Sequence, residues 1–599
     1  MLYINEMEEI LQKEVWEKVN QNLVAKMLSE FMYEDMIKPE LEDGMYFLLT
    51  AAGRKYRYRA EKRLFDSFDV KSGSVEACEN DTWHPAVNAI QFLTDIKENI
   101  GMSSETAGHL IRELNQTLIA DANLMVHHRK TADALTELDY EELEGEMTGH
   151  PWITYNKGRI GFGLDDYVNF APENQNETKL FWVAVRRERS QFQSVTDLNY
   201  EKLIENELGA EMIMHFSGII RKYGLNPEDY YFMPVHEWQW KNVLIQNFPE
   251  DLAYKNMIPL EEGTDHYLPQ QSIRTFVNVS DKRKHHVKLP MSILNTLVYR
   301  GLPSERTVIA PQVTAFIKGI FENDSFLKED CEVVLPGEIA SLNVDHPHYS
   351  SLNGAPYQYN EMLGAIWRES IYGYLKTGEK PITLAALHHV DAYGKPYVQS
   401  LIEQSGLSAN EWMKQFFHVI MPPLLHFLYQ YGTVFSPHGQ NTILILKDSK
   451  PVRLAVKDYV DDVNISDQPF PELAGLDEDL KAVLRSEPPE GLTQFIFTGL
   501  FICHLRYLSN VLINHYLMDE KTFWSYLAEA IQDYQAKFPQ LEERFKLFDF
   551  FKPELTKLCL NRNRMVDYGY GDGEDRPHAS EFGKVRNALH DIKEERIMV

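Results

Sequence analysis

The feature that most constrains this chain is a polar loop, 436–441, that opens a β-hairpin. Two apolar runs, 441–446 and 452–459, flank the turn 447–451, a pattern typical of paired strands. The polar side chains on this hairpin are His438, Gln440, Asn441 and, on the returning run, Asp458. Amide and carboxylate oxygens in this arrangement suit Mg²⁺ beside a nucleotide. The sequence therefore predicts a nucleotide site, the alternative being a capped turn with Asp458 paired to a surface base.

The chain is long enough to fold as two to four packed units around a large active site, because its 599 residues exceed the usual domain size. Apolar residues recur at helical spacing over 9–31 and 86–125, and residues 45–60 alternate as in a hairpin. We therefore expect the first ~150 residues to form a mainly helical unit with a small sheet.

The later part of the chain mixes extended and helical patterns. Extended runs at 230–235 and 286–289 lie among polar loops, which is typical of a ligand-facing region. Helices are predicted at 359–375, 411–431, 492–517 and 520–537. The Gly-rich, charged end after Asp567 is expected to fray.

Net charge and cysteine usage narrow the class of protein. A net charge of −29 repels phosphodiester backbones, so a large nucleic-acid interface is not expected. The four cysteines show no paired spacing, which argues against a zinc site or disulfides and favours a reducing cytoplasm. The start lacks a basic leader pattern, and the longest apolar stretch, 495–505, is too short to span a bilayer. We therefore predict a cytoplasmic protein without a membrane partner, in which anionic ligands need a local cluster of bases.

Such a basic cluster is visible around 271–276, with Lys288 and Arg300 following it. The segment itself contains Ser272, Arg274 and Thr275. Arginine supplies a bidentate fork, lysine a point charge and the hydroxyls neutral donors, so this set suits a triphosphate. The nearby run 282–286 is instead expected to be a solvated basic face.

Two more segments carry an unusual density of polar donors. The Gly/Pro-framed stretch 148–163 contains His150, Lys157 and Arg159, which could wrap phosphates and an acyl carboxylate together. The segment 234–240 places His236 among tryptophans at a strand end, and its alternative interpretation is a packed aromatic corner. The usual P-loop, HExxH and GxSxG motifs are missing from the sequence.

Taken in order, these four segments resemble the IucA/IucC family, the synthetases that build siderophores independently of nonribosomal peptide synthetases. The residues that carry the resemblance are 149–151, Lys157, Arg159, 161–162, 234–236, 238–240, Ser272, Arg274, Thr275, Lys288, Arg300, 438–441 and Asp458. The resemblance extends over nearly the whole chain, including the late segment 558–562.

Within this family the chain is most similar to the type C branch, the desferrioxamine, alcaligin, putrebactin and bisucaberin synthetases. Residues 161–167 and 170–173 carry that likeness. Where citrate-using branches have a second His-Pro, this sequence has 152–154, and Glu237 stands in place of a proline. The aromatic and apolar side chains of Trp152 and Ile153 suit a long methylene-rich donor better than a compact trianion, so citrate is not expected to be a substrate. The alternative is that this loop only packs against the fingers and that citrate binds elsewhere.

The resemblance implies an α+β, multidomain fold arranged as a hand, with a kinase-like palm and a large helical portion. The implied parts are a thumb at 1–148, fingers with the ATP-phosphate contacts at 149–370, and a palm at 371–599. A homodimer is implied as well.

The resemblance also implies roles for individual residues. The implied ATP-binding residues are Ser272, Arg274, Thr275, Lys288, Arg300, Lys157, Arg159, His438 and Asn441. The implied catalytic residues are His438, Arg300 and His150. The implied Mg²⁺ ligands are Gln440, Asn441 and Asp458. The implied substrate-binding residues are His236, Gln239 and Trp152.

The implied reaction agrees with simple carboxylate chemistry. A carboxylate is a poor electrophile at neutral pH, so ATP must first convert it to an acyl adenylate, with pyrophosphate leaving. An amine then attacks the adenylate and releases AMP. The implied donor is an N-hydroxy-N-succinyl derivative of cadaverine or putrescine, and repeated condensation would end in a macrocyclic hydroxamate siderophore.

Two other functions are weighed against this interpretation. A kinase-like small-molecule phosphotransferase would share His438, Asn441 and Asp458, but Gln440 occupies the place where that class needs an aspartate base. A non-enzymatic scaffold or iron-binding protein would have no use for Arg274, Lys288 and Arg300 together, and the sequence contains no cluster at metal-ligand spacing.

Overall fold

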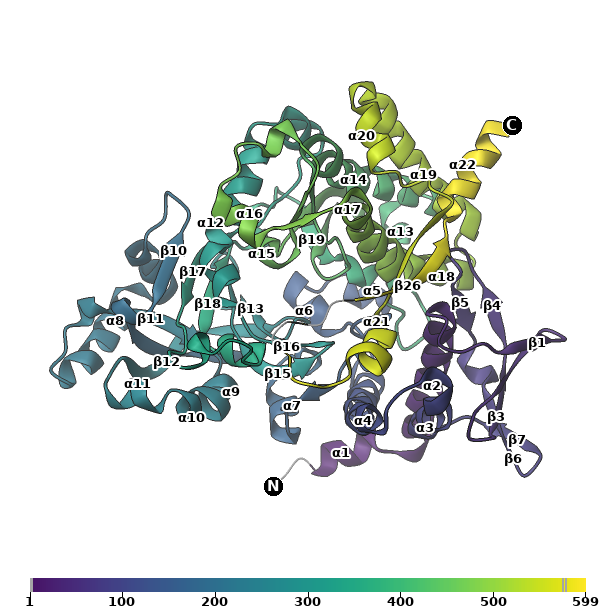
Figure 1. The fold of residues 1–599 in the computed structure, drawn as a ribbon, viewed down its shortest axis with the longest axis horizontal. Coiled ribbons are helices and arrows are strands. Elements are labelled where there is room, and N and C mark those ends of the chain that lie inside the picture. Colours follow the sequence, from purple (N-terminus) through teal and green to yellow (C-terminus); the bar gives the residue numbers. More distant parts are fainter. Residues whose placement is uncertain (1–3, 574–575, 577–578, 599) are drawn as a thin grey trace.

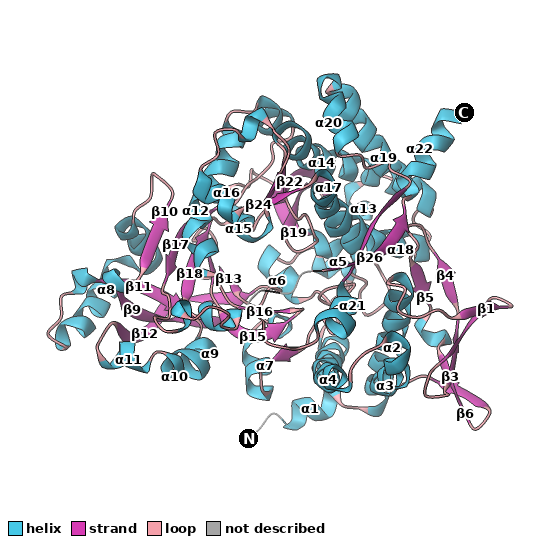
Figure 2. Cartoon of the chain, in the orientation of Figure 1, coloured by secondary structure: helices cyan, strands magenta, loops and turns pink. Residues whose placement is uncertain are grey.

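The computed structural model describes residues 4–573, 576 and 579–598, and three lobes surround a central junction (Figure 1). The N-terminal lobe, drawn purple, lies on the right, a large sheet with its covering helices lies on the left, and a mainly helical lobe lies at the top. Figure 2 shows both helices and strands in each lobe, and nearly all of the strand pairs are antiparallel. The predicted α+β class is therefore confirmed.

The N-terminal lobe combines long helices with a small antiparallel sheet, as its apolar spacing predicts. Its helices are α1 Ile4–Ile10, α2 Lys13–Tyr33, α3 Ala89–Ile100, α4 Ser104–His127, α5 Ala132–Leu135 and α6 Tyr140–Gly145. Its strands are β1 Glu40–Glu42, β2 Met45–Leu49, β3 Lys55–Tyr58, β4 Ala60–Lys62, β5 Phe68–Val70, β6 Glu76–Glu79 and β7 Thr82–Pro85. Helix α3 begins where the Asn88 side chain accepts the Gln91 N–H and ends at left-handed Gly101. These two boundary residues separate α3 from the rest of the predicted helical stretch 86–125.

The left lobe is built on an eight-stranded antiparallel sheet of order β10-β17-β18-β14-β13-β12-β9-β11. Its strands are β9 Thr178–Arg186, β10 Gln191–Ser194, β11 Tyr230–Val235, β12 Met257–Pro269, β13 Thr275–Asn278, β14 His286–Lys288, β17 Glu338–Asn343 and β18 Gly364–Arg368. Its helices are α7 Leu164–Phe170, α8 Tyr200–Lys222, α9 Glu237–Gln239, α10 Ile245–Asn247 and α11 Pro249–Ala253. A three-stranded sheet at its inner edge contains β8 Arg159–Ile160, β15 Met291–Asn295 and β16 Val298–Arg300. The extended runs predicted at 230–235 and 286–289 are confirmed.

Two local predictions for this lobe are wrong. The stretch 359–375, predicted as a helix, contains β18, because a short apolar run that is buried on both faces carries no helical period. The run 282–286 is not a solvated basic face. Lys284 pairs with Asp265 at 2.6 Å, and His286 is buried within the sheet.

The top lobe continues with a long connecting helix, a small sheet and a helical bundle. Its elements up to the hairpin are α12 Ser304–Glu322, β19 Glu379–Thr383, α13 Tyr397–Ser405, α14 Ala409–Tyr431, β20 Thr433–Val434, β21 Thr442–Lys447 and β22 Lys450–Val456. Those beyond it are α15 Tyr459–Asp462, β23 Asn464–Ser466, α16 Glu478–Val483, β24 Arg485–Glu487, α17 Pro489–Ile496, α18 Arg506–Asn514, α19 Glu520–Lys537 and α20 Glu542–Leu547. The helices predicted at 411–431, 492–517 and 520–537 are confirmed.

The predicted hairpin is confirmed as β21 and β22, with a shorter turn than expected. Lys447 pairs with Lys450, and the two residues between them, Asp448 and Ser449, have φ of 50° and 57°. A two-residue turn with left-handed residues matches the twist of the flanking strands. Asp458 follows β22 instead of lying on it, so its side chain is placed by the loop that leads into α15.

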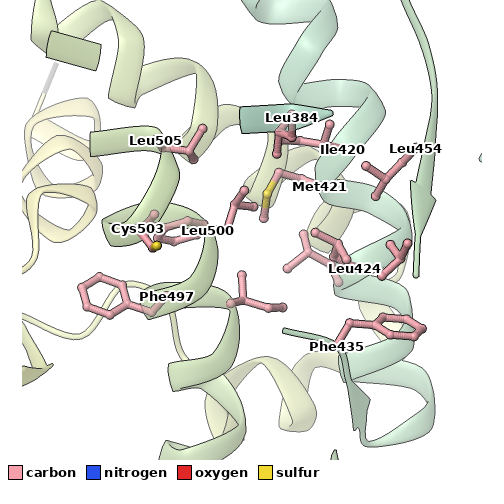
Figure 3. Packing of buried hydrophobic residues seen from close by; sticks show 14 of the residues in the cluster. Leu384, Ile420, Met421, Leu424, Phe435, Leu454, Phe497, Leu500, Cys503 and Leu505 are labelled. Carbon is pink, nitrogen blue, oxygen red and sulfur yellow. The ribbon is translucent and has the colours of Figure 1, made fainter. Parts of the chain in front are cut away.

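The apolar stretch around 495–505 belongs to a longer helix in the core. Residues Pro489–Asn514 form one 26-residue helical run, and its most apolar 18-residue window has a mean hydropathy of 1.5, so the run could cross a bilayer by length and composition. The length argument against membrane insertion is therefore wrong, but 67% of its most apolar window is buried inside the protein. Figure 3 shows Leu500 of this run facing Met421 and Leu424 of α14. The run thus packs as the central helix of the top lobe.

The end of the chain does not fray where it is described. β25 Glu554–Cys559 pairs with β26 Ser580–Arg586, and α22 Ala588–Met598 packs on α19. Between β25 and β26 in the chain, α21 Leu560–Arg562 lies near the N-terminal lobe, and the chain then crosses toward β16 (yellow in Figure 1). The prediction failed because a Gly-rich, charged composition does not reveal contacts made with distant parts of the chain. The part of this prediction that concerns residues 574–575, 577–578 and 599 lies outside the described residues.

Candidate active site

Segments far apart in the sequence meet at the junction of the three lobes. β13 and β14 pair so that Thr275 lies opposite Lys288, and the hairpin β15–β16 ends at Arg300. The loop before β21 carries His438 and Asn441, and the loop after β22 carries Asp458. The fold therefore brings together the basic cluster and the polar hairpin, which the sequence shows only as separate motifs.

Lys288 is the centre of a buried charge cluster. Its Nζ lies 2.5 Å from Asp458 Oδ1, 2.8 Å from Asp461 Oδ2 and 3.8 Å from Glu338 Oε1. The Arg274 guanidinium lies 3.1 Å from the same Asp461 oxygen. The Lys288 and Arg274 side chains are only 3% and 8% exposed, so water cannot solvate their charges. These cations depend on the acids, or on an anionic ligand, for their partners.

The acids of this cluster differ in their protonation behaviour. Burial would raise the pKa of Asp458, but the Lys288 ammonium outweighs burial and lowers that pKa to about 2. Burial would also raise the pKa of Asp461, but the cations of Lys288 and Arg274 outweigh burial and hold that pKa well below its usual range. Burial and the carboxylates of Asp458 and Asp461 raise the pKa of Asp462 well above its usual range. Three carboxylates that repel one another favour an added cation.

This donor set fits Mg²⁺, which prefers carboxylate and amide oxygens. Asn441 donates a hydrogen bond to the Asp462 carboxylate, and the charge of Asp458 acts on the same group by raising its pKa. The side chain of Gln440, the third predicted ligand, is half-buried next to them in the sequence. Within the described part of the chain, the one group of three whose ligand atoms all lie within 4.8 Å of one another is elsewhere, at His418, Glu529 and Asp533. The acids of the junction are therefore not a preformed metal cage.

Arg300 adds a cation on the other side of the junction. Its guanidinium donates to the Thr296 hydroxyl within the β15–β16 hairpin. Burial and the guanidiniums of Arg274 and Arg576 lower the pKa of Arg300. Cations that face one another in this way are stabilised by an anion between them. The arrangement can therefore hold phosphate or carboxylate oxygens.

Two half-buried imidazoles complete the junction. Burial lowers the pKa of His438 to about 4 and lowers the pKa of His150 well below its usual range. The Nδ1 of His150 accepts hydrogen bonds from the Trp152 and Ile153 N–H groups, each at 3.2 Å. Both rings are thus neutral near pH 7 and can donate a hydrogen bond to a reacting oxygen without adding fixed charge.

Lys157 and Arg159, both predicted to bind ATP, are already paired with acids. Lys157 Nζ lies 2.7 Å from Asp121 Oδ1. The Arg159 guanidinium donates one hydrogen bond to each Glu173 carboxylate oxygen, at 2.7 and 2.9 Å, and both side chains are almost fully buried. Contact with ATP stays a prediction for both residues, and the pairing favours a structural role for Arg159.

Breaking the Arg159–Glu173 pair is expected to destabilise the protein strongly. Replacing Arg159 by alanine leaves a buried carboxylate unpaired, which costs about 3–5 kcal/mol. Burial would raise the pKa of Glu173, but Arg159 outweighs it and lowers that pKa. The contribution of the pair is therefore present above the unfolded pKa of about 4.3 and lost as the pH falls through the lower folded value. Urea denaturation at pH 7 and at a series of pH values from 5 down to well below 4 would measure both effects.

A double variant provides the control for this pair. Arg159→Met with Glu173→Leu removes both charges, and we expect it to be more stable than Arg159→Ala alone. Equal stability of Arg159→Ala and the wild type would contradict the structural role.

The three predicted substrate-binding residues are buried. His236, Gln239 and Trp152 are 2%, 1% and 0% exposed. The Gln239 amide exchanges two hydrogen bonds with Ser292, at 2.9 and 2.8 Å. Trp152 Nε1 donates to Glu34 Oε1 at 2.7 Å. Their contact with substrate stays a prediction, and these bonds favour support of the neighbouring loops.

Ser272 and Thr275 shape the turn that leads into β13. The Thr275 N–H donates to Ser272 Oγ at 3.2 Å, and Ile273 between them has a φ of 64°. The turn directs the Arg274 side chain to the cluster around Lys288. Direct contact of the two hydroxyls with ATP stays a prediction.

Several residues at the junction were missed by sequence reasoning. Lys26 of α2 donates to the carbonyl oxygens of His150 and Ile153, at 2.9 and 2.8 Å. Burial lowers the pKa of Lys26 to about 8, and Lys157 adds to this effect. A lysine within an amphipathic helix gives no signal of such a contact. The rings of His388 and His504, 5.3 Å apart, and Arg576 from the end of the chain are further examples.

Comparison with known proteins gives the family. Residues 139–389 match the model of the IucA / IucC family, and residues 410–573 match that of the ferric iron reductase FhuF-like transporter family. The chain is 40% identical to the rhizobactin siderophore biosynthesis protein RhbF of Rhizobium meliloti, over 96% of each chain. It is 34% identical to the putrebactin synthase of a Shewanella species, over 92% of this chain and 87% of that protein.

Solved structures show the same architecture. The aerobactin synthetase IucC of Klebsiella pneumoniae superposes with a TM-score of 0.85 and 30% identity, over 96% of this chain and 99% of that one. The petrobactin biosynthesis protein AsbB of Bacillus anthracis superposes with a TM-score of 0.90, over 100% and 99%, and at 24% identity it shows the fold alone. The chain therefore belongs to the IucA/IucC family of siderophore synthetases.

Proposed function

We propose that this siderophore synthetase is an ATP-dependent carboxylate–amine ligase that works through an acyl adenylate. The observation that carries the proposal is the buried pair Arg274 and Lys288 against the acids Asp458 and Asp461, with half-buried Arg300 close to Arg274. Such a mixture of cations and acids suits a nucleotide triphosphate with its divalent cation.

In the first half-reaction, a carboxylate oxygen of the donor attacks the α-phosphorus of ATP, and the bond to the β-phosphate breaks. Arg274, Lys288 and Arg300 would take up the charge that develops on the phosphate oxygens. Binding of phosphates would also release Lys288 from its carboxylate partners. Mg²⁺ held by Asp458 and Asn441 would neutralise the pyrophosphate that leaves.

In the second half-reaction, a primary amine attacks the carbonyl carbon of the adenylate. The new C–N bond forms, the bond to the phosphate oxygen breaks, and AMP leaves with the electron pair. The neutral imidazoles of His438 and His150 can hydrogen-bond to the oxygens of the reacting group. The ammonium form of this substrate loses one proton to solvent before it attacks as a free amine, and the nitrogen loses a second proton to solvent as the amide forms.

We propose an N-hydroxy-N-succinyl derivative of cadaverine or putrescine as the donor, condensed repeatedly and closed into a macrocyclic hydroxamate. The likeness to a protein named putrebactin synthase supports this choice. Other relatives are named aerobactin synthase and a citryl-spermidine ligase, so citrate is the donor to test against.

A donor comparison tests this substrate class. Pyrophosphate release would be measured with N-hydroxy-N-succinyl-cadaverine, its putrescine analogue and citrate at equal concentrations, with products identified by mass spectrometry. We expect faster release with a hydroxamate donor and a cyclic amide product. A higher rate with citrate would contradict the type C assignment while leaving the ligase chemistry in place.

The second candidate is a kinase-like phosphotransferase, which would use the same cations and acids. It is less well supported because Gln440 stands where that class carries its aspartate base.

We also propose that the protein acts in the cytoplasm as a homodimer and binds neither nucleic acid nor a membrane. The proposed domain boundaries lie after residue 148, between thumb and fingers, and after residue 370, between fingers and palm.

A further inference from the structure

The end of the chain forms a strap between the N-terminal lobe and the β15–β16 hairpin. We define the C-terminal strap as residues 561–573 together with Arg576. Its first residue donates to the N-terminal lobe, where the Asn561 N–H and Nδ2 donate to Glu34 Oε1 at 3.0 and 2.8 Å. Further along, the Tyr570 hydroxyl donates to Glu113 of α4. The strap is thus held firmly on one side before it crosses to the hairpin (Figure 1).

The strap contacts the hairpin first at its turn. Thr296 and Leu297 occupy the turn with φ of 45° and 80°, a left-handed conformation that branched side chains rarely adopt. The Arg564 guanidinium donates to the Leu297 carbonyl and, at 2.6 Å, to the Gly569 carbonyl. Since Arg300 donates to the Thr296 hydroxyl, the strap supports the turn on which the Arg300 side chain rests.

The second contact lies directly after Arg300. Arg576 Nη2 lies 3.1 Å from the Gly301 carbonyl oxygen, and Arg274 donates to the same oxygen. Arg576 also forms a bidentate pair with Glu361, at 3.0 and 2.5 Å. A Cβ on Gly301 would lie 2.4 Å from the Cβ of Glu361, so this peptide fits tightly against the acid.

Arg576 therefore does two things at once. Arg576 and Arg274 both donate to the Gly301 carbonyl oxygen, and these two hydrogen bonds fix the direction of the chain directly after Arg300. Arg576 also neutralises Glu361, whose side chain is 6% exposed and lies beside Arg274. An unpaired carboxylate at this place would compete with phosphate oxygens for the guanidiniums of Arg274 and Arg300.

We propose that Arg576 is a positioning residue of the synthetase reaction, which keeps Arg300 and Arg274 oriented toward the anionic substrate by clamping Gly301 and neutralising Glu361. The role assigned to Arg300 rests on the proposed function. The clamp itself depends only on the contacts of the strap.

The test compares three variants of the full chain in pyrophosphate release. Arg576→Ala is expected to lower kcat at least tenfold with a smaller change in the KM for ATP. Arg576→Lys is expected to recover part of that loss, because an ammonium still neutralises Glu361. The matched control is Arg562→Ala, since the Arg562 guanidinium stacks on Phe582 at 3.9 Å, away from the hairpin.

A second pair of variants separates orientation from general stability. Combining Arg576→Gln with Glu361→Gln removes both charges, and we expect it to be faster than Arg576→Gln alone. Wild-type rates in Arg576→Ala would overturn the proposal. So would an equal slowing of Arg576→Ala, Arg576→Lys and the double variant, because a purely structural role predicts no rescue by charge.

Hydrogen exchange measures the clamp independently of the reaction. In Arg576→Ala, amides within 291–302 should exchange at least several-fold faster than in the wild type or Arg562→Ala. Unchanged exchange there would overturn the clamp even if activity fell. If the wild type released no pyrophosphate with any donor, the proposed function would fail, and exchange would still decide whether Arg576 holds the hairpin.

Discussion

Replacing Lys288 by alanine is expected to lower pyrophosphate release by roughly 10²–10³-fold, the usual loss when one charged donor to a developing oxyanion is removed. Its ammonium is buried between Asp458 and Asp461 and would move to the phosphates when ATP binds. Arg274→Ala should have a comparable effect, because Arg274 shares the Asp461 oxygen. A coupled pyrophosphate assay at saturating donor would measure both variants.

Stability must be separated from catalysis in these variants. Lys288→Ala leaves buried carboxylates without a cation, so its free energy of unfolding should also fall. The matched control is Lys284→Ala on the connection before β14, which breaks the pair with Asp265 and a hydrogen bond to the Glu207 carbonyl oxygen. A folded Lys288→Ala or Arg274→Ala protein with near-wild-type release would remove the phosphate-site assignment.

Replacing Asp458 by asparagine is expected to raise the Mg²⁺ concentration needed for half-maximal turnover by about 10–100-fold, with a smaller change in substrate binding. The change removes a full negative charge from the site while it keeps the shape of the side chain. Its low pKa means that Asp458 is ionised throughout the pH range of an assay. Titrating Mg²⁺ in the pyrophosphate assay would measure the shift.

The β21–β22 hairpin supplies the control for Asp458→Asn. Asp448→Asn lies in its exposed two-residue turn, where asparagine suits the left-handed conformation, and should leave the metal requirement unchanged. An unchanged requirement in Asp458→Asn would instead show that Asp461 or Asp462 holds the ion.

The elements that sequence reasoning placed well are those with a strong local period. Helix α19 matches the predicted 520–537, and β11 matches 230–235. The strand β18 was mistaken for a helix because its residues are buried on both faces and so show no alternation. The end of the chain was misjudged because its order comes from contacts with distant segments such as Glu361 and Glu113.

The candidate site was predictable as a set of residue types but not as a geometry. Lys288 and Asp458 are 170 residues apart, and no periodic pattern relates them. The acidic pair after Asp458 was visible in the sequence, yet its link to Arg274 depends on how the large sheet packs against the hairpin. The pairing of Arg159 with Glu173 could not be predicted either, although both residues lie in segments that carry the family resemblance.

The central claim is that this siderophore synthetase activates a carboxylate by adenylation. The measurement that tests it most directly is identification of the nucleotide products from ATP, Mg²⁺ and N-hydroxy-N-succinyl-cadaverine or its putrescine analogue by phosphorus NMR. We predict AMP and pyrophosphate in amounts equal to the amide bonds formed, and roughly 10²–10³-fold less of both from Lys288→Ala within the same time. ADP as the nucleotide product would contradict the adenylation mechanism and favour phosphoryl transfer.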